Sequence, residues 1–455
     1  MAPQHPSSAT TVFLDQPPSC LQFHPSSPNH LVIGTYLLSE HSNAADGSIQ
    51  QTKTGSLQLW HLEPATHQLS LIEKFPIAHA VFDLHFHPQD PTLLAIVTSA
   101  GCVSFFRVAL PSDTTTTTTT TTAAAANADG SPSNSSIITH LTTHQAHPTP
   151  NIPALFLAWT PPSWPLLPPQ EPQPNSNSNS NPNPSSIFGF AITFSDGSTT
   201  LFTSHSPPSH QFQITNVASF NATQPIEVWF VALATIPSSS SSSSSPSPSS
   251  DGNEPQSRIP YMFTGNDFGS VHTRSFDPLT MASPDAMDDG NAGMILNHDD
   301  RGRHHTAGVT AILPLPIPLD VTGGAPWLLT GSYDESLRVY SASRRGEVLG
   351  EVGLGGGVWR LQVLESVLGG SEWVGLVLAS CMHGGTRVVR VRVGFGERDE
   401  EGCEMEVLAE FTEHESMNYA SDVWRVGDEV QRREKVVVVS SSFYDRRVCV
   451  WTVDV

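Results

Sequence analysis

The stretch Leu328–Tyr340, LLTGSYDESLRVY, joins an apolar run to a small hydroxyl corner, an aspartate in a tight turn and a second, alternating strand. Alternation with a period of two on both sides of a turn predicts a β-hairpin. The same arrangement returns in Val436–Val453, VVVVSSSFYDRRVCVWTV, and in Tyr261–Phe276, YMFTGNDFGSVHTRSF. Weaker versions occupy 31–62, 95–108, 190–204 and 376–393, which makes seven copies. A recurring unit of this kind decides the architecture of a chain.

Seven repeats of this size predict a ring of four-stranded sheets. The units lie near 18–62, 78–108, 137–205, 212–277, 303–342, 346–393 and 407–453. Each resembles a propeller blade, which takes roughly 40–45 residues. We therefore expect an all-β chain, a seven-bladed β-propeller that forms a single domain over residues 1–455. The segment Thr10–Asp15, TTVFLD, is expected to provide the outer strand that closes the ring on the last blade.

Low-complexity tracts interrupt the repeats. One contains nine consecutive threonines followed by four alanines, and others are rich in Asn, Pro and Ser. Such compositions cannot bury enough apolar surface to offset the chain entropy, and long surface loops are tolerated. We expect disordered loop insertions at about 111–136, 168–186, 237–257 and 283–302.

The composition excludes several classes of function. The formal net charge of −22 argues against a nucleic-acid binder, which needs a basic surface. The charge serves solubility or attracts a cationic partner. The five cysteines are scattered without C-x-x-C spacing, which argues against a disulfide framework or a zinc site. We name no metal-binding residue and expect no cofactor. The start lacks a signal-peptide pattern and no apolar run would span a membrane, so a cytoplasmic protein is expected.

Serine, histidine and aspartate recur together within the repeats, but we interpret them as structural. His304 or His305 with Ser332 and Asp334 would form one hydrogen-bond network. A second would comprise His414, Ser441 or Ser442, Asp445 and Trp451. Buried polar groups need such partners. No G-x-S-x-G elbow, H-E-x-x-H motif or Walker loop points to a hydrolase, protease or nucleotide-binding site.

An ordered set of motifs gives a more specific indication. TGSYDESLRVY, GGGVWRLQV, ASCMHGGTRVVRV, NYASDVW and SSSFYDRRVCVW follow one another between Thr330 and Trp451. Together they resemble the WD-repeat diphthine methyl ester hydrolases (the diphthine methyltransferase family) of the diphthamide pathway. The resemblance is best over 260–455 and weak over 1–110. The family's Tyr-Gly-Ala-Asp-Trp run stands here as Tyr419–Trp424, YASDVW.

This resemblance implies hydrolysis of the methyl ester of a modified histidine on translation elongation factor 2, the protein substrate. It also implies a trimethylammonium group beside the ester, and aromatic faces bind such groups. Tyr333, Tyr419, Trp424 and Tyr444 are the candidate binding residues. Tyr419 and Tyr444 are alternatively aromatics at the edge of the core.

Ester hydrolysis also needs a base and an oxyanion donor. His383 in CMHGG is the candidate catalytic base, because it stands in a turn beside two glycines, and Asp422 would orient it. Alternatively, His383 is a turn residue with no catalytic role. At the level of the whole protein, the alternatives are a non-catalytic scaffold in protein–protein interaction and an adaptor for a ubiquitin ligase. The sequence does not indicate an oligomeric state.

Overall fold

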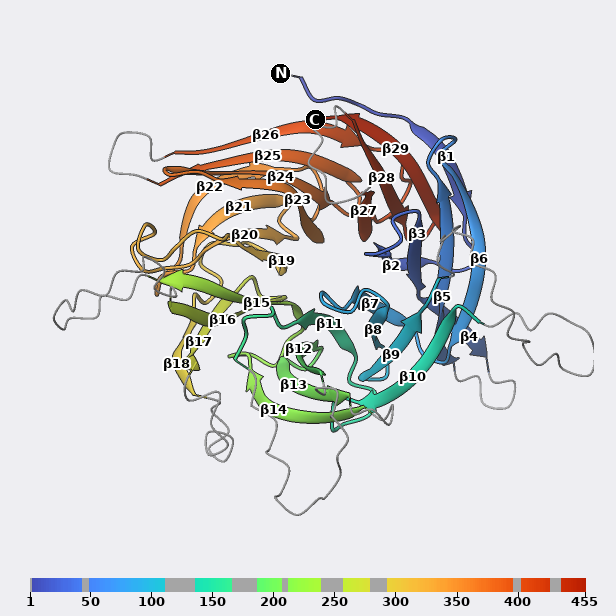
Figure 1. The fold of residues 1–455 in the computed structure, drawn as a ribbon, viewed down its shortest axis with the longest axis horizontal. Helices are drawn as coiled ribbons and strands as arrows, with labels where there is room; N and C mark the ends of the chain where they lie inside the picture. The colour runs from blue at the N-terminus through green and yellow to red at the C-terminus, as the bar shows by residue number, and fades with distance from the viewer. Residues whose placement is uncertain are drawn as a thin grey trace, which may run out of the picture.

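Seven β-sheets are arranged in a ring in the computed structural model (Figure 1). We call the space between their innermost strands, which contains two cavities described below, the central channel. The structure describes residues 2–42, 49–110, 136–165, 186–206, 212–238, 257–278, 293–395, 402–425 and 435–455. Each sheet is antiparallel and runs from the channel to the outside in chain order, except that the last sheet takes its outer strand from the N-terminus. The seven-bladed propeller expected from the repeats is therefore confirmed.

Each blade contributes one strand to the channel wall, one to the outer edge and two between them. The innermost strands are β2 (Pro18–Phe23), β7 (Val81–Phe86), β11 (Ala154–Trp159), β15 (Val228–Ser238), β19 (Val309–Pro314), β23 (Arg360–Leu368) and β27 (Ala420–Trp424). The second strands are β3 (His30–Thr35), β8 (Leu93–Thr98), β12 (Ser186–Phe194), β16 (Ser257–Asn266), β20 (Trp327–Ser332), β24 (Glu372–Ser380) and β28 (Lys435–Ser442).

The other strands complete the blades in the same order. The third strands are β5 (Ile49–Glu63), β9 (Cys102–Val108), β13 (Ser198–Ser206), β17 (Val271–Phe276), β21 (Ser336–Ser341), β25 (Thr386–Gly394) and β29 (Arg447–Asp454). The outer strands are β6 (Gln68–Ile77), β10 (Ile138–Gln145), β14 (Gln213–Asn221), β18 (Met294–Asp299), β22 (Glu347–Gly353), β26 (Cys403–Phe411) and β1 (Ser8–Phe13). An additional strand, β4 (Leu37–Ser42), pairs with the first half of β5.

Burial follows the position of a strand within its blade. The second strands lie between neighbours on both faces, so most of their described residues are buried; in β8, every residue is buried. The outer strands consist mainly of half-buried and exposed residues, as β10 does after its buried Ile138. The core is thus divided into layers between adjacent blades, and the channel wall is left free to carry polar side chains.

The ring closes through the predicted N-terminal strand. β1 pairs antiparallel with β29, with Thr11 opposite Cys449. The backbone N–H and the hydroxyl of Ser8 both donate to the carboxylate of Glu413. Because the N- and C-terminal segments share one sheet, β29 has a partner on both sides and the ring has no open edge here.

Two expectations about boundaries need correction. Several predicted units began with a strand that belongs to the preceding blade; Ile138–Gln145, for example, is the outer strand of the second blade rather than the start of the third. Its polar, alternating sequence gave no sign of which sheet it joins. The insertion expected at 283–302 is too long, because Met294–Asp299 forms β18 and Asp300 is buried.

The remaining insertions fall largely on residues that the structure does not describe. The ranges 111–135, 168–185, 239–256 and 283–292 all lie outside the described residues. The expectation of disorder there stays a prediction.

The polar networks exist, but with different hydroxyls from those expected. His305 Nε2 lies 2.9 Å from Thr330 Oγ1. His414 Nε2 lies 2.8 Å from Ser440 Oγ, which also accepts a hydrogen bond of 3.0 Å from the indole of Trp451. The partner therefore stands two positions before Ser332 in one blade and just before Ser441 in the other. Both histidines are buried inside blades, as expected of structural residues.

Candidate active site in the central channel

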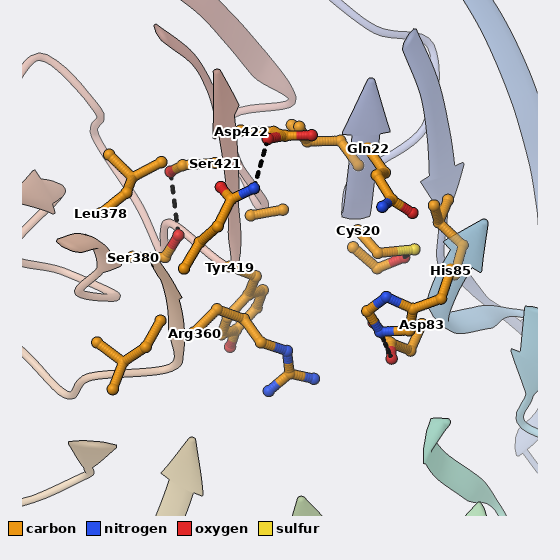
Figure 2. A pocket seen from close by; sticks show the side chains of 16 residues that line it. Cys20, Gln22, Asp83, His85, Arg360, Leu378, Ser380, Tyr419, Ser421 and Asp422 are labelled. Atoms are coloured by element: carbon orange, nitrogen blue, oxygen red, sulfur yellow. Dashed lines mark hydrogen bonds and ion pairs between the residues drawn. The ribbon is translucent and has the colours of Figure 1, made fainter. Parts of the chain in front are cut away.

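A cavity of about 250 Å³ lies in the channel between the first, second, sixth and seventh blades. Its wall carries an unusual density of polar side chains for the inside of a protein. Figure 2 shows the imidazole of His85 and the guanidinium of Arg360 directed into it from opposite sides. The lining also includes Gln22, Asp83 and Tyr419. A concave site with a few convergent polar groups is the usual form of a ligand site.

The side chains of Asp83 and His85 lie two residues apart on β7 and therefore share one face of the strand. His85 Nε2 lies 2.8 Å from Asp83 Oδ2. Asp83 is buried, whereas His85 is half-buried at the cavity surface. Since an ionised carboxylate can only accept, Nε2 carries the proton and the lone pair of the neutral ring is on Nδ1. Nδ1 has no hydrogen-bond partner among the described residues. This arrangement is that of an oriented general base.

Arg360 begins β23 and crosses the channel towards the third and fourth blades. Its Nη1 donates to the carbonyls of Thr310 and Trp359, at 3.2 and 2.9 Å. The guanidinium carbon lies 4.8 Å from the ring centroid of Phe156 and 4.7 Å from that of Trp359. Burial lowers the pKa of the guanidinium, and the nearby Asp83 opposes this effect. These contacts hold the cation at the cavity, with no direct carboxylate partner among the described residues.

Asp422, a predicted catalytic residue, also lines the cavity, but its hydrogen bonds are structural in kind. Its carboxylate accepts from the backbone of Phe23 at 2.8 Å and from Gln362 Nε2 at 2.8 Å. The residue therefore ties β27 to β2 and β23. Burial raises the pKa of Asp422, although these hydrogen bonds oppose the shift. A second cavity, of about 490 Å³, shares Gln22, Gln362 and Asp422 with the first and lies towards the other end of the channel.

Aromatic side chains form an arc around one mouth of the channel. They lie either in turns between second and third strands or at the starts of innermost strands, and antiparallel pairing brings both places to the same face. The arc runs through Trp229, Tyr333, Trp359, Tyr419, Phe443, Tyr36 and Phe82, and Tyr444 packs on Phe443. We call these eight residues the aromatic arc.

Tyr419 links the arc to the cavity, because it belongs to both. Its ring centroid lies 5.1 Å from that of Trp359 and 5.4 Å from that of Phe443. Burial raises the pKa of Tyr419 to about 12, so the phenol is neutral and can donate a hydrogen bond. Acidic groups border the other end of the arc: Asp267 accepts a 2.7 Å hydrogen bond from the indole of Trp229.

The structure brings together three of the four aromatics predicted to bind substrate. Tyr333 and Tyr419 lie in the arc, and Tyr444 is exposed at its edge. Trp424 does not join them: it stands at the opposite end of β27, about 15 Å along the strand from Tyr419. Its indole donates to Asn29 Oδ1 at 2.8 Å. Tyr419 and Trp424 are close in the sequence, but the five-residue strand β27 runs along the channel and places them at opposite ends of it.

The predicted catalytic pair is not assembled in the way the sequence suggested. His383 is exposed in the turn between β24 and β25, where its Nε2 lies 3.4 Å from Glu335 Oε1. Asp422, in contrast, is engaged with Phe23 and Gln362. The two residues are not in contact in the structure, so Asp422 does not orient His383 there. The catalytic role of His383 stays a prediction.

Sequence reasoning missed Asp83, His85 and Arg360. The run VFDLHF, Val81–Phe86, offered a signal: two ionisable residues two positions apart interrupt an apolar strand at the start of a repeat. In a propeller, such a strand faces the channel. Arg360 follows GGGVW at the corresponding place in the sixth unit.

Among the described residues no group of three potential metal ligands occurs, and no helix is long and apolar enough to cross a membrane.

Two curated proteins are similar to the chain in sequence. A diphthine methyltransferase of Schizosaccharomyces pombe is 32% identical over 148 residues, which are 32% of this chain and 38% of the relative. A human diphthine methyltransferase is 28% identical over 156 residues, which are 31% of this chain and 30% of the relative. The matches therefore span about a third of the length of these relatives. No family model matches the chain.

Solved structures resemble the whole chain. Sqt1 of Chaetomium thermophilum, in a crystal structure with the N-terminus of ribosomal protein L10, superimposes with a TM-score of 0.51 at 13% identity. The comparison covers 98% of this chain and 99% of that protein. At this identity the likeness concerns the fold alone. The chain is therefore a seven-bladed β-propeller that is similar in sequence, over about a third of its length, to diphthine methyltransferases.

Proposed function

We propose that the protein hydrolyses the methyl ester of diphthine methyl ester on translation elongation factor 2, a step of diphthamide biosynthesis. The relatives' name points to chemistry on a methyl group of diphthine. The observation that carries the proposal is the Asp83–His85 pair, which faces a cavity joined through Tyr419 to the aromatic arc.

His85 is the proposed general base. Nδ1 takes a proton from a water molecule as its oxygen forms a bond to the ester carbonyl carbon. Asp83 holds the ring by accepting from Nε2–H and stabilises the imidazolium that results. The carbon–methoxy bond then breaks, and the imidazolium returns its proton to the leaving oxygen. The products are methanol and the free carboxylic acid, which ionises.

The aromatic arc is the proposed site for the trimethylammonium group. Quaternary ammonium ions bind to the faces of Trp and Tyr rings, and each such contact contributes on the order of 0.5–2 kcal/mol. Tyr419 lines the cavity and Trp359 packs against Tyr419, so a cation on their faces would place a neighbouring ester within the cavity. We retain Tyr333 and Tyr444 as binding residues of the same arc and leave Trp424 out.

Substitution of the two histidines tests the assignment. The His85→Gln and His383→Gln variants would be compared with the unmodified chain on elongation factor 2 that carries the methyl ester. Loss of the ester, which lowers the mass by one methylene, would be followed by mass spectrometry. We expect His85→Gln to be slowed by about 10²–10⁴-fold, as loss of a general base predicts. A slow His383→Gln variant together with an unimpaired His85→Gln variant would assign the catalytic role to His383 instead.

A stable complex with elongation factor 2 but no loss of the ester in any variant would indicate the scaffold function instead. In that case the arc would serve recognition alone, and the polar groups of the channel would have no catalytic part.

A further inference from the structure

We infer that Arg360 makes the central cavity a binding site for a carboxylate. The inference extends the proposed function, and the choice of ligand rests on that function. The free acid formed by hydrolysis would be held by the guanidinium of Arg360. The structural evidence for a carboxylate site is separate from the evidence for His85 as a base, because Arg360 lies on the opposite wall of the cavity (Figure 2).

Among the described residues, no carboxylate is a direct counter-ion of Arg360. No carboxylate of the described residues lies within 4.0 Å of its guanidinium nitrogens. Its partners are two backbone carbonyls and the faces of Phe156, Phe230 and Trp359. Buried cations are normally paired with an anion, because removal from water is costly. A guanidinium that is already positioned by neutral groups is therefore suited to an anion that arrives with a ligand.

The nearest acidic group does not fill this role. Asp83 acts on Arg360 only at longer range. Its Oδ2 lies 2.8 Å from His85 Nε2 and accepts a weak bond from the backbone of Leu157 at 3.5 Å. The fork of N–H groups on Arg360 matches the two oxygens of a carboxylate, so the site selects this class of anion over a simple halide.

The surroundings further restrict the ligand. Trp359 contacts both the guanidinium and Tyr419 in the arc, with distances of 4.7 Å to the guanidinium carbon and 5.1 Å between ring centroids. A ligand with a carboxylate next to a quaternary ammonium group would therefore meet an arginine and aromatic faces together. Glycine betaine, N,N,N-trimethylglycine, is the smallest such compound and serves as the probe.

Calorimetric titration of the full chain tests the inference. We expect glycine betaine to bind about tenfold or more tightly than either tetramethylammonium, which lacks the carboxylate, or glycine betaine amide, in which a neutral amide replaces it. Arg360→Met should remove this preference, and Arg360→Lys should restore part of it. Equal binding of the three compounds to the unmodified chain would contradict the inference without reliance on any variant.

Arg274 offers a matched control in the fourth blade. It is buried, donates to the carbonyl of Asn221 at 3.1 Å and lies over the ring of Phe220, yet it is not part of the cavity wall. Arg274→Met should leave the preference for glycine betaine intact, and an equal loss in both variants would contradict a role specific to Arg360. Ester turnover, measured separately, distinguishes the two proposals. Turnover without the carboxylate preference contradicts the inference, whereas the preference without turnover contradicts the proposed reaction.

Discussion

Nε2 of His85 lies 2.8 Å from Oδ2 of Asp83, on the face of β7 that lines the channel. Other histidines of the chain make similar hydrogen bonds in different surroundings. His147 Nε2 lies 3.0 Å from Asp196 Oδ2, and His414 Nε2 lies 2.8 Å from Ser440 Oγ, and neither histidine borders the central cavity. A histidine–carboxylate contact therefore occurs elsewhere in the chain, and the position in the channel is what distinguishes Asp83 and His85.

Asp83→Asn tests this distinction. An amide at this position can donate to the ring, so it favours the tautomer whose Nδ1 carries the proton and cannot act as a base. We expect the rate constant of ester hydrolysis to fall by about 10²–10⁴-fold, with little change in KM. The matched control is Asp196→Asn, which alters a histidine–carboxylate pair in the third blade and should leave the rate unchanged. Equal rates for both variants would remove the catalytic assignment.

The aromatic arc predicts a change in substrate affinity. Removal of the ring in Tyr419→Ala or Trp359→Ala should raise KM for the ester by about 3- to 30-fold, since each cation–π contact contributes on the order of 0.5–2 kcal/mol. Trp424→Phe should leave KM unaltered, because this residue stands at the far end of β27. An effect confined to Trp424 would show that the ligand approaches from the other mouth of the channel.

Asp422 is predicted to act on stability. Asp422→Ala leaves the N–H of Phe23 and the amide of Gln362 without their acceptor inside the channel wall. We expect the free energy of unfolding to fall by roughly 1–3 kcal/mol, the usual cost of unsatisfied buried groups. Chemical denaturation measures it. If stability were unchanged and turnover lost, Asp422 would regain the catalytic role that the sequence suggested.

Stability should also depend on pH through the buried histidines. Burial lowers the pKa of His414 from 6.5 to about 4 and that of His305 to about 3. Between these values and 6.5 the unfolded chain binds more protons than the folded chain, so stability rises with pH in this window. The contribution is complete above pH 6.5 and is lost as the pH falls towards 4. Each histidine adds at most about 1.4 kcal/mol per pH unit.

Thermal unfolding between pH 4 and 7 measures this dependence. We expect His414→Asn to have a shallower dependence of the melting temperature on pH, whereas His79→Gln, at an exposed position, should retain the original slope. An unchanged slope in His414→Asn would mean that this histidine does not contribute.

The repeat pattern predicted the fold because hairpins with alternating residues have a local signature. It predicted ring closure as well, since the segment before the first unit, Thr10–Asp15, was a candidate outer strand for the last blade. It could not place outer strands such as Ile138–Gln145, whose half-exposed sequence fits either adjacent sheet. Tyr333 and Tyr419 were predicted as aromatics of loops that could bind a trimethylammonium group. Trp424 was chosen in the same way but lies at the other end of β27.

The catalytic candidates were harder to predict for a physical reason. His383 was chosen from its local glycines, but a turn on the rim is exposed. Asp83, His85 and Arg360 converge from blades that are distant in the sequence, and only the closed ring brings them to one cavity. A local sequence pattern cannot indicate that residues so far apart in the chain line the same cavity.

The most direct test of the account is the fate of the methyl ester on elongation factor 2 when it is incubated with the unmodified protein. The account predicts that the modified histidine loses the mass of one methylene and that methanol is released, and that His85→Gln does neither at a comparable rate. An ester that persists in the presence of folded, unmodified protein would contradict the proposed hydrolysis.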